Sequence, residues 1–224
     1  MHTVQLALTI AMLATPLFAY EAPGMCDSAA LVAAETYGIP PQVMLAISRV
    51  ETGRQLDGEL RPWPWAINAA GQPHWFESRD EAAEFVDVAM NQGLTNIDIG
   101  CFQLNLRWHG SSFHSIDHML DPAENADYAA QFLVENYERT GTWVDAVAAY
   151  HSLTPEYAEA YVEKVEAVLK TLHETAGTDR IASAEVTRPA ASNNFPLLQA
   201  GTSGSIASLV PSAGLARPLF AMAP

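Results

Sequence analysis

Proline, glycine and helix-capping residues divide most of this sequence into short helical segments, and this punctuation restricts the fold more than any other feature. The helical pattern of residues 27–37 stops at Gly38. Pro41 opens a second segment, PQVMLAISRVETG, which stops at Gly53. Comparable signals predict further helices over residues 81–92, 122–140, 142–151 and 155–172.

Two segments between these helices lack a helical period. Residues 63–76, WPWAINAAGQPHWF, are aromatic and carry an Ala-Gly break, which predicts a small hairpin or extended flap. Residues 94–105, LTNIDIGCFQLN, begin with alternating apolar residues and turn at Gly100. The predicted fold class is therefore mainly α, as a single α+β domain whose β part is a small hairpin or flap.

The two ends of the chain differ in composition from the middle. Residues 4–19 form an uncharged apolar stretch that is too short to span a bilayer and contains Pro16, so we expect a signal peptide cleaved near Ala19. From about Glu174 onward the composition shifts to Ala, Ser, Thr, Pro and Gly, which predicts a disordered tail. The predicted boundaries are residues 1–19 for the signal, 20–173 for the folded domain and 174–224 for the tail.

Two cysteines, Cys26 and Cys101, remain after removal of the signal. An even count in an exported chain favours one disulfide over two free thiols. A loop of that length stabilises the fold by about 4 kcal/mol when closed. The alternative, a nucleophilic Cys101 with a histidine base, stays open at this stage, although nothing in GCFQLN marks an activated thiolate.

Composition narrows the class of ligand. The chain has 224 residues, of which 49% are hydrophobic and 17% charged, enough for one sizeable core. Its formal net charge of -15 and the lack of any basic run argue against nucleic acid, because phosphate backbones are bound by clustered Lys and Arg. No cofactor motif is present, so we expect no cofactor.

Glu51 is the strongest candidate for chemistry. It lies in the last turn of its helix, and the spacing Met44, Ile47, Glu51 puts its carboxylate on the stripe that faces the core. Desolvation and the negative end of the helix dipole both disfavour the charged form, so we expect its pKa to rise from about 4.3 towards about 6 or 7. The competing interpretation is a surface carboxylate paired with Arg49 or Arg54.

Two later segments carry polar side chains of the kind that bind neutral sugars. In IDIGCFQLNLRWH, Gln103 and Asn105 offer amide donors and acceptors two residues apart, although turn or cap roles are common for such residues. In AVAAYHS, Tyr150 and His151 end an amphipathic helix, where the phenol is placed to hydrogen-bond the Glu51 carboxyl or simply to pack in the core.

The order of these three segments resembles the soluble lytic transglycosylase (SLT) family, which has a lysozyme-like fold. A helix ending in E-T-G, then G-C-F-Q-L-N about fifty residues later and A-A-Y-H-S about forty-five after that, is similar to the family motifs E-S-x-x, G-L-M-Q-I and A-Y-N-x-G. The similarity covers about residues 26–170. Three departures are Thr52 for serine, Cys101-Phe102 for Leu-Met, and His151 for asparagine without a following glycine.

The resemblance implies an enzyme that cuts the glycan strands of peptidoglycan. It makes Glu51 the sole catalytic acid and base, Gln103 a glycan-binding residue and Tyr150 the residue that orients the acid, with Asn105 and His151 as further substrate contacts. With the predicted signal peptide, we expect a monomer in the periplasm that acts on peptidoglycan, with the tail as a link to envelope machinery such as a flagellum or a secretion system. The implied reaction leaves a 1,6-anhydro end, since the sugar's own C6 hydroxyl attacks C1.

Several alternatives remain at the level of sequence. A hydrolase of the same bond needs a second carboxylate, for which Asp57, Glu59 and Asp98 are candidates. A scaffold that binds peptidoglycan without cutting it is a further alternative, against which the presence of Glu51 argues.

The histidines at positions 109, 114 and 118 suggest zinc, but the run HSIDH lacks the glutamate of H-E-x-x-H, so we predict no metal. The flap aromatics are expected either to stack on sugar rings or to form a packed cluster; these are Trp63, Trp65, Trp75 and Phe76.

Overall fold

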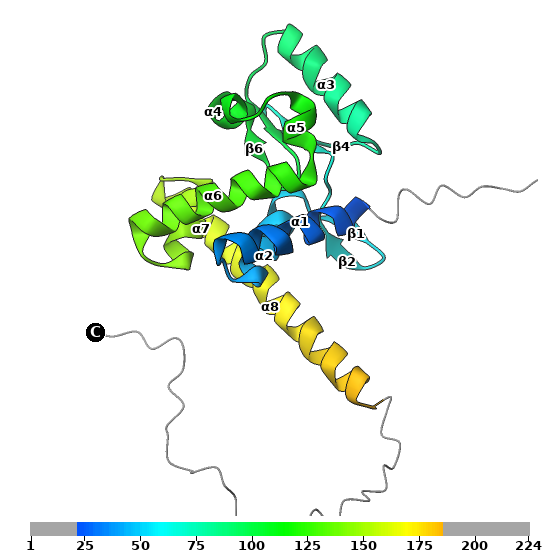
Figure 1. The fold of residues 1–224 in the computed structure, drawn as a ribbon, viewed down its shortest axis with the longest axis vertical. Coiled ribbons are helices and arrows are strands. Elements are labelled where there is room, and N and C mark those ends of the chain that lie inside the picture. The colour runs from blue at the N-terminus through cyan, green and yellow to red at the C-terminus, as the bar shows by residue number, and fades with distance from the viewer. Residues whose placement is uncertain (1–21, 186–224) are drawn as a thin grey trace, which may run out of the picture. The chain divides into compact units, whose positions relative to one another are not determined.

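A computed structural model describes the backbone of residues 22–185 and the side chains of residues 22–175. Its helices are α1 (Ala22–Tyr37), α2 (Pro41–Thr52), α3 (Arg79–Asn91), α4 (Leu106–His109), α5 (Ile116–Leu120), α6 (Pro122–Thr140), α7 (Trp143–His151) and α8 (Pro155–Glu185). Its strands are β1 (Arg54–Leu56), β2 (Glu59–Arg61), β3 (Ala66–Ala69), β4 (Gln72–Trp75), β5 (Ile97–Ile99) and β6 (Leu104–Asn105). The mainly helical class with a small β-hairpin is therefore confirmed (Figure 1).

The capping residues predicted from the sequence form hydrogen bonds at the helix ends. Ser78 accepts a hydrogen bond from the backbone of Glu81, Asp121 accepts from two amides of the first turn of α6, and Thr142 accepts from Asp145. Gly141 ends α6 in the left-handed conformation. The capping box at Ser78 is incomplete, because the Glu81 carboxylate accepts from the amide of Glu77 instead of Ser78.

Two helix boundaries differ from the prediction. Helix α1 begins at Ala22, five residues before the expected start at Asp27. Helix α8 continues to Glu185, beyond its expected end at Leu172 and beyond residue 174, where the tail is predicted to start. The residues after 174 include several alanines and no proline before Pro189, and the helix already formed propagates through such a sequence. The predicted signal and the tail beyond residue 185 lie outside the described residues.

The strands form two antiparallel sheets. Strands β1 and β2 make a separate hairpin, and the larger sheet has the order β4-β3-β5-β6. The predicted hairpin at residues 63–76 is confirmed as β3-β4, joined by a tight turn in which Ala70 and Gly71 both have positive φ. The register sets Asn68 opposite Asp98, and Asp98 opposite Asn105. This polar row across three strands becomes important for the site.

The core lies where α1, α2, α6 and α7 pack together and against the larger sheet. Its fully buried large side chains include Met44, Ile47, Ile67, Val86, Ile97, Ile99, Phe102, Met119, Leu120 and Leu133. Backbone contacts divide the chain into two units at Arg180, and every residue of the site described below belongs to the first. Within the described residues, no helix is both long and apolar enough to cross a membrane.

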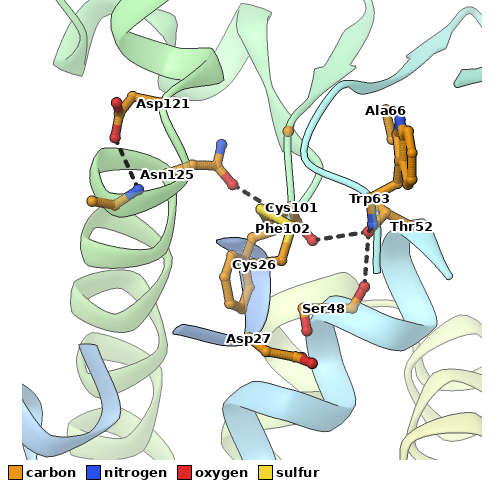
Figure 2. The surroundings of a disulfide bond; sticks show 12 residues. Cys26, Asp27, Ser48, Thr52, Trp63, Ala66, Cys101, Phe102, Asp121 and Asn125 are labelled. Atoms are coloured by element: carbon orange, nitrogen blue, oxygen red, sulfur yellow. Dashed lines mark hydrogen bonds between the residues drawn. A yellow bond between two sulfur atoms is a disulfide. The ribbon is translucent and has the colours of Figure 1, made fainter. Parts of the chain in front are cut away.

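A disulfide joins Cys26 of α1 to Cys101 in the turn between β5 and β6, which confirms the predicted pairing (Figure 2). The bond spans 75 residues of sequence. It also removes the alternative of a nucleophilic Cys101, because that sulfur is no longer a thiol. The turn that carries Gln103 is thus covalently fixed to the first helix.

Candidate active site

A polar cavity of about 360 Å³ opens beside the C-terminal end of α2. It is lined by Glu51, Asn68, Asp98, Gln103, Leu104, Asn105, Trp108, His109, Phe132, Tyr150 and His151. All five residues proposed from the sequence as catalytic or substrate-binding are among them. Segments separated by about one hundred residues in the sequence therefore meet at one cavity.

Glu51 reaches this cavity because α2 is held firmly at its end. Met44 and Ile47 are fully buried on the same stripe, as their spacing predicts. The hydroxyl of the next residue, Thr52, accepts a hydrogen bond from the backbone of Trp63 and lies 3.0 Å from the Ser48 carbonyl and 3.4 Å from the Cys101 carbonyl (Figure 2). A single buried hydroxyl thus ties the last turn of α2 to the disulfide-linked turn.

Glu51 does not form the surface ion pair considered as the alternative. Arg49 makes a two-pronged bond to Asp27 at 2.7 and 3.0 Å. Arg54 lies over the ring of Trp63, 4.5 Å from its centroid. Both arginines are therefore engaged away from the cavity, and the pairing interpretation is wrong.

Glu51 is half-buried, and its surroundings favour the protonated form of its carboxyl. Burial raises its pKa from 4.5 to about 7; the hydrogen bond from Tyr161 opposes this rise, the negative charge of Asp98 adds to it, and the positive charge of Lys164 opposes it. A carboxylic acid with such a pKa is able to donate a proton near neutral pH and to accept it back as a carboxylate.

The phenol that holds Glu51 belongs to Tyr161 of α8, whereas the resemblance had assigned this contact to Tyr150. The Tyr161 hydroxyl donates to Glu51 Oε1 at 2.5 Å. The Tyr150 hydroxyl donates instead to the backbone carbonyl of Phe102 at 2.9 Å. Tyr150 lines the cavity, but its direct partner is the turn between β5 and β6.

That turn presents Gln103 in a fixed orientation. Gly100 has φ +81°, and a side chain there would collide with the amide of Asn125 at 2.6 Å. Gln103 itself has φ +47°, and its Nε2 donates to the carbonyls of Ala66 and Gly100, both at 3.0 Å. Because carbonyls only accept, the side-chain oxygen of Gln103 is the atom that it offers to a ligand.

Asn125 supports the same turn from below. Its Oδ1 accepts from the Phe102 amide at 2.9 Å (Figure 2). Its Nδ2 donates to the carbonyls of Ile99 and Met119 at 3.0 and 2.9 Å. Asn125 is fully buried, so it satisfies three backbone groups that water does not reach. Nothing in the local sequence marks this role, because an asparagine near the start of a helix usually indicates only the helix terminus.

Asp98 and Asn105 form a second polar element of the cavity. Asn105 donates to Asp98 Oδ1 at 2.7 Å and to Asn96 at 3.0 Å, and its own oxygen caps α4 by accepting from Arg107. The amide of Asn105 is therefore occupied, and its first effect is to hold Asp98. Burial raises the pKa of Asp98, against the opposing effects of Asn105, His151 and His109.

The aromatic residues of the flap do not line the cavity. Trp63 is buried and its indole donates to the Phe76 carbonyl, while the Trp75 indole donates to the Thr52 carbonyl. Phe76 packs on Phe85 with ring centroids 5.1 Å apart. Trp63 and Phe76 therefore belong to a packed cluster, as the alternative predicts, while sugar stacking by Trp75, which is 41% exposed, stays a prediction.

A different aromatic residue takes the exposed position. Trp108 in α4 lines the cavity and is 73% exposed. A large indole in water beside a polar cavity provides an apolar face for a sugar ring. Its sequence neighbourhood, LRWHG, gave no periodic signal that marks an exposed position.

Of the histidines considered for zinc, His114 and His118 lie together with ring centroids 5.0 Å apart, but each of the other contacts involves a separate partner. His109 lies 3.0 Å from the Tyr128 hydroxyl, and His118 lies 3.4 Å from Glu124. In residues 22–175 there is no group of three or more His, Cys, Asp or Glu side chains arranged to hold a metal ion. The chemistry of the cavity is carried by carboxyl, amide, imidazole and phenol groups.

A helical domain with a small sheet and a buried acid over a polar cavity has the features of the lysozyme-like class. The family described as "Transglycosylase SLT domain" matches residues 75–162, which confirms the family resemblance found in the sequence. The match includes Gln103, Tyr150 and Tyr161 and begins after Glu51. The chain matches no curated protein and no solved structure. An SLT domain indicates glycan-cleaving activity on peptidoglycan at the level of the family.

Proposed function

We propose that this protein is an exported lytic transglycosylase that cleaves the β-1,4 bond between N-acetylmuramic acid and N-acetylglucosamine, leaving a 1,6-anhydromuramic end. The observation that carries the proposal is Glu51, a half-buried acid with a pKa of about 7 on the wall of a polar cavity. The SLT domain supports the class of substrate. The amides and the exposed indole of the cavity suit a neutral, acetylated sugar.

In the proposed mechanism, Glu51 acts twice. The protonated carboxyl first donates its proton to the glycosidic oxygen, which leaves with the N-acetylglucosamine. The resulting carboxylate then takes the proton from the muramic C6 hydroxyl, whose oxygen bonds to C1, and the acid is regenerated. Tyr161 stabilises the carboxylate between these steps, because its hydroxyl donates to Oε1. Gln103 accepts a hydrogen bond from the sugar through its side-chain oxygen.

A second candidate is hydrolysis of the same bond, and Asp98 is the observation that favours it. Of the three carboxylates considered for this role, Asp98 lines the cavity with Glu51, whereas Asp57 and Glu59 belong to the β1-β2 hairpin and do not. In hydrolysis, a second carboxylate activates water or attacks C1. The proposal favours transglycosylation because one carboxylate suffices when the nucleophile is part of the sugar.

The test is digestion of purified peptidoglycan followed by mass spectrometry of the released fragments. The wild type is expected to release anhydro-muropeptides, and Glu51→Gln is expected to be at least about a hundredfold slower. Glu84→Gln is the matched control, since Glu84 is an exposed residue on α3 away from the cavity. Reducing ends in place of anhydro ends would assign hydrolysis, with Asp98→Asn then inactive. Binding without any cleavage would assign a non-catalytic peptidoglycan-binding protein.

The proposal includes export to the periplasm as a monomer, with the tail as the part that contacts envelope machinery. The disulfide supports an oxidising compartment. Intact-mass analysis of protein recovered from the periplasm of a Gram-negative host tests the export step. A mature chain that begins just after Ala19 is expected, and a full-length cytoplasmic product would refute it.

A further inference from the structure

The last residue of α7 stacks on the tyrosine that holds the proposed acid. The rings of His151 and Tyr161 are nearly parallel, with an interplanar angle of 2° and centroids 4.4 Å apart. Tyr161 is buried, whereas His151 is exposed on the wall of the cavity. The histidine ring therefore lies between the tyrosine and the space that a substrate would occupy.

We propose that His151 is a positioning residue, which holds the Tyr161 ring in place so that the phenol oxygen stays in line with Glu51 Oε1. A hydrogen bond of 2.5 Å depends steeply on the position of its donor. The Tyr161 ring is free to tilt about its side-chain bonds unless a neighbour covers its face. In the part of the chain with described side chains, the ring stacked on that face is His151.

The neighbouring contacts explain why this position, at the end of α7, controls the site. Tyr150 fixes the turn that carries Gln103, through its bond to the Phe102 carbonyl. His151, one residue later, covers the partner of Glu51 on α8. Tyr150 therefore fixes the turn that carries Gln103, and His151 supports the tyrosine that binds Glu51.

His151 acts by contact and not by charge. Burial lowers the pKa of His151, and the positive charge of Lys164 lowers it further, while Asp98 opposes both effects. The imidazole is therefore neutral at neutral pH. Burial has the largest effect on the pKa of Glu51, and the side chains that modify it are Tyr161 and Lys164 on α8 and Asp98 on β5. A change at His151 therefore reaches the acid either through Tyr161, whose loss raises the pKa of Glu51, or through the burial of Glu51, whose loss lowers it.

The experiment measures the pKa of Glu51 directly, by a ¹³C NMR titration of its side-chain carboxyl in the full mature chain. Tyr161→Phe removes the donor that stabilises the carboxylate, so the pKa of Glu51 is expected to rise by about 1 pH unit. His151→Ala is expected to raise it by about half as much, because the phenol is less well placed. His151→Phe keeps a flat ring and is expected to restore the wild-type value.

A double variant separates the two possible routes. If His151 acts through the phenol, His151→Ala adds no further shift in a Tyr161→Phe background. Trp143→Ala is the matched control, since Trp143 begins α7 at the opposite end from His151, and its ring stacks on that of Tyr137 with centroids 4.2 Å apart. An unchanged pKa in His151→Ala, an equal shift in both backgrounds, or the same shift in Trp143→Ala would overturn the proposal.

The inference rests on the proposed function only in naming Glu51 as the acid. The titration needs no substrate and no turnover. A protein without peptidoglycan-cleaving activity would thus refute the proposed function and leave the result for His151 standing, while a failed titration would leave the reaction untouched.

Discussion

The raised pKa of Glu51 has a cost in stability, and the pH dependence of that cost can be measured. The pKa is 4.5 without the protein environment and about 7 in the folded chain. Between these two values the folded state binds a proton that the unfolded state has released. The stability contribution of this group is therefore complete below pH 4.5, falls as the pH rises, and is lost above pH 7.

The magnitude follows from the size of the shift. At about 1.4 kcal/mol for each pH unit, a rise from 4.5 to about 7 destabilises the folded state by about 3 kcal/mol at pH 8. Glutamine has the shape of the protonated acid and does not ionise. Glu51→Gln is thus expected to be about 3 kcal/mol more stable than the wild type at pH 8 and nearly equal to it at pH 4.

Urea unfolding of both proteins at pH 4, 6 and 8, with the disulfide intact, measures this difference. The difference between the two proteins is the decisive quantity, because other titrating groups affect both equally. The measurement at pH 4 reports any direct effect of the amide on packing and serves as the internal control. A difference that stays constant from pH 4 to pH 8 would show that Glu51 is not held neutral by its surroundings.

Three further predictions concern the same site and its support. The rate of peptidoglycan cleavage is expected to fall about tenfold for each pH unit above pH 7, because Glu51 ionises there. Initial rates from pH 5 to 9 measure this dependence. A rate that rises over pH 7–9 would contradict the proposed role of Glu51 as the acid. Asn125→Ala removes the side chain that bonds three buried backbone groups, and it is expected to lower the free energy of unfolding by about 3 kcal/mol. Urea unfolding measures this loss. A loss below about 1 kcal/mol would mean that water replaces the amide. Replacing Cys26 and Cys101 with serine opens a loop of 75 residues and is expected to cost about 4 kcal/mol, and reduction of the wild type should reproduce the loss; equal stability of both forms would refute it.

Local signals in the sequence were sufficient for most of the helices and for the position of the acid. Each capping residue acts on amides two or three positions away, so the signal and its effect lie in one segment. The same holds for Glu51, because Met44 and Ile47 fix the face of α2 on which it lies. These predictions succeeded since they needed no knowledge of tertiary contacts.

The partner of Glu51 was missed for the opposite reason. Tyr161 lies at core spacing between Tyr157 and Val165, and its ring is indeed buried like a core residue. Nothing in the local pattern distinguishes a buried phenol that contacts only apolar neighbours from one that meets a carboxyl 110 positions away. A pairing of that kind appears only when α2 and α8 are placed side by side.

The role of the flap at residues 63–76 also could not be predicted from local sequence alone. Composition identified a segment rich in aromatic residues, but a strand has two faces, and composition does not determine which face meets a ligand. The alternation in β5 was more informative. Ile97 and Ile99 are buried, so Asp98 between them must point to the other face, where Asn68 and Asn105 flank it. The register between strands, which the sequence does not encode locally, then brings this carboxylate to the cavity.

The arrangement links stability to activity at one place. Thr52 ties the end of α2 to the turn at Cys101, and the disulfide and Asn125 fix that turn to α1 and α6. The separation between Glu51 and Gln103 therefore depends on contacts that also stabilise the fold. Loosening the turn should lower the rate of cleavage before it unfolds the protein, because a displacement of about 1 Å is small for packing but large for a proton transfer. Exposed positions of α3, which share none of these contacts, should lack this coupling.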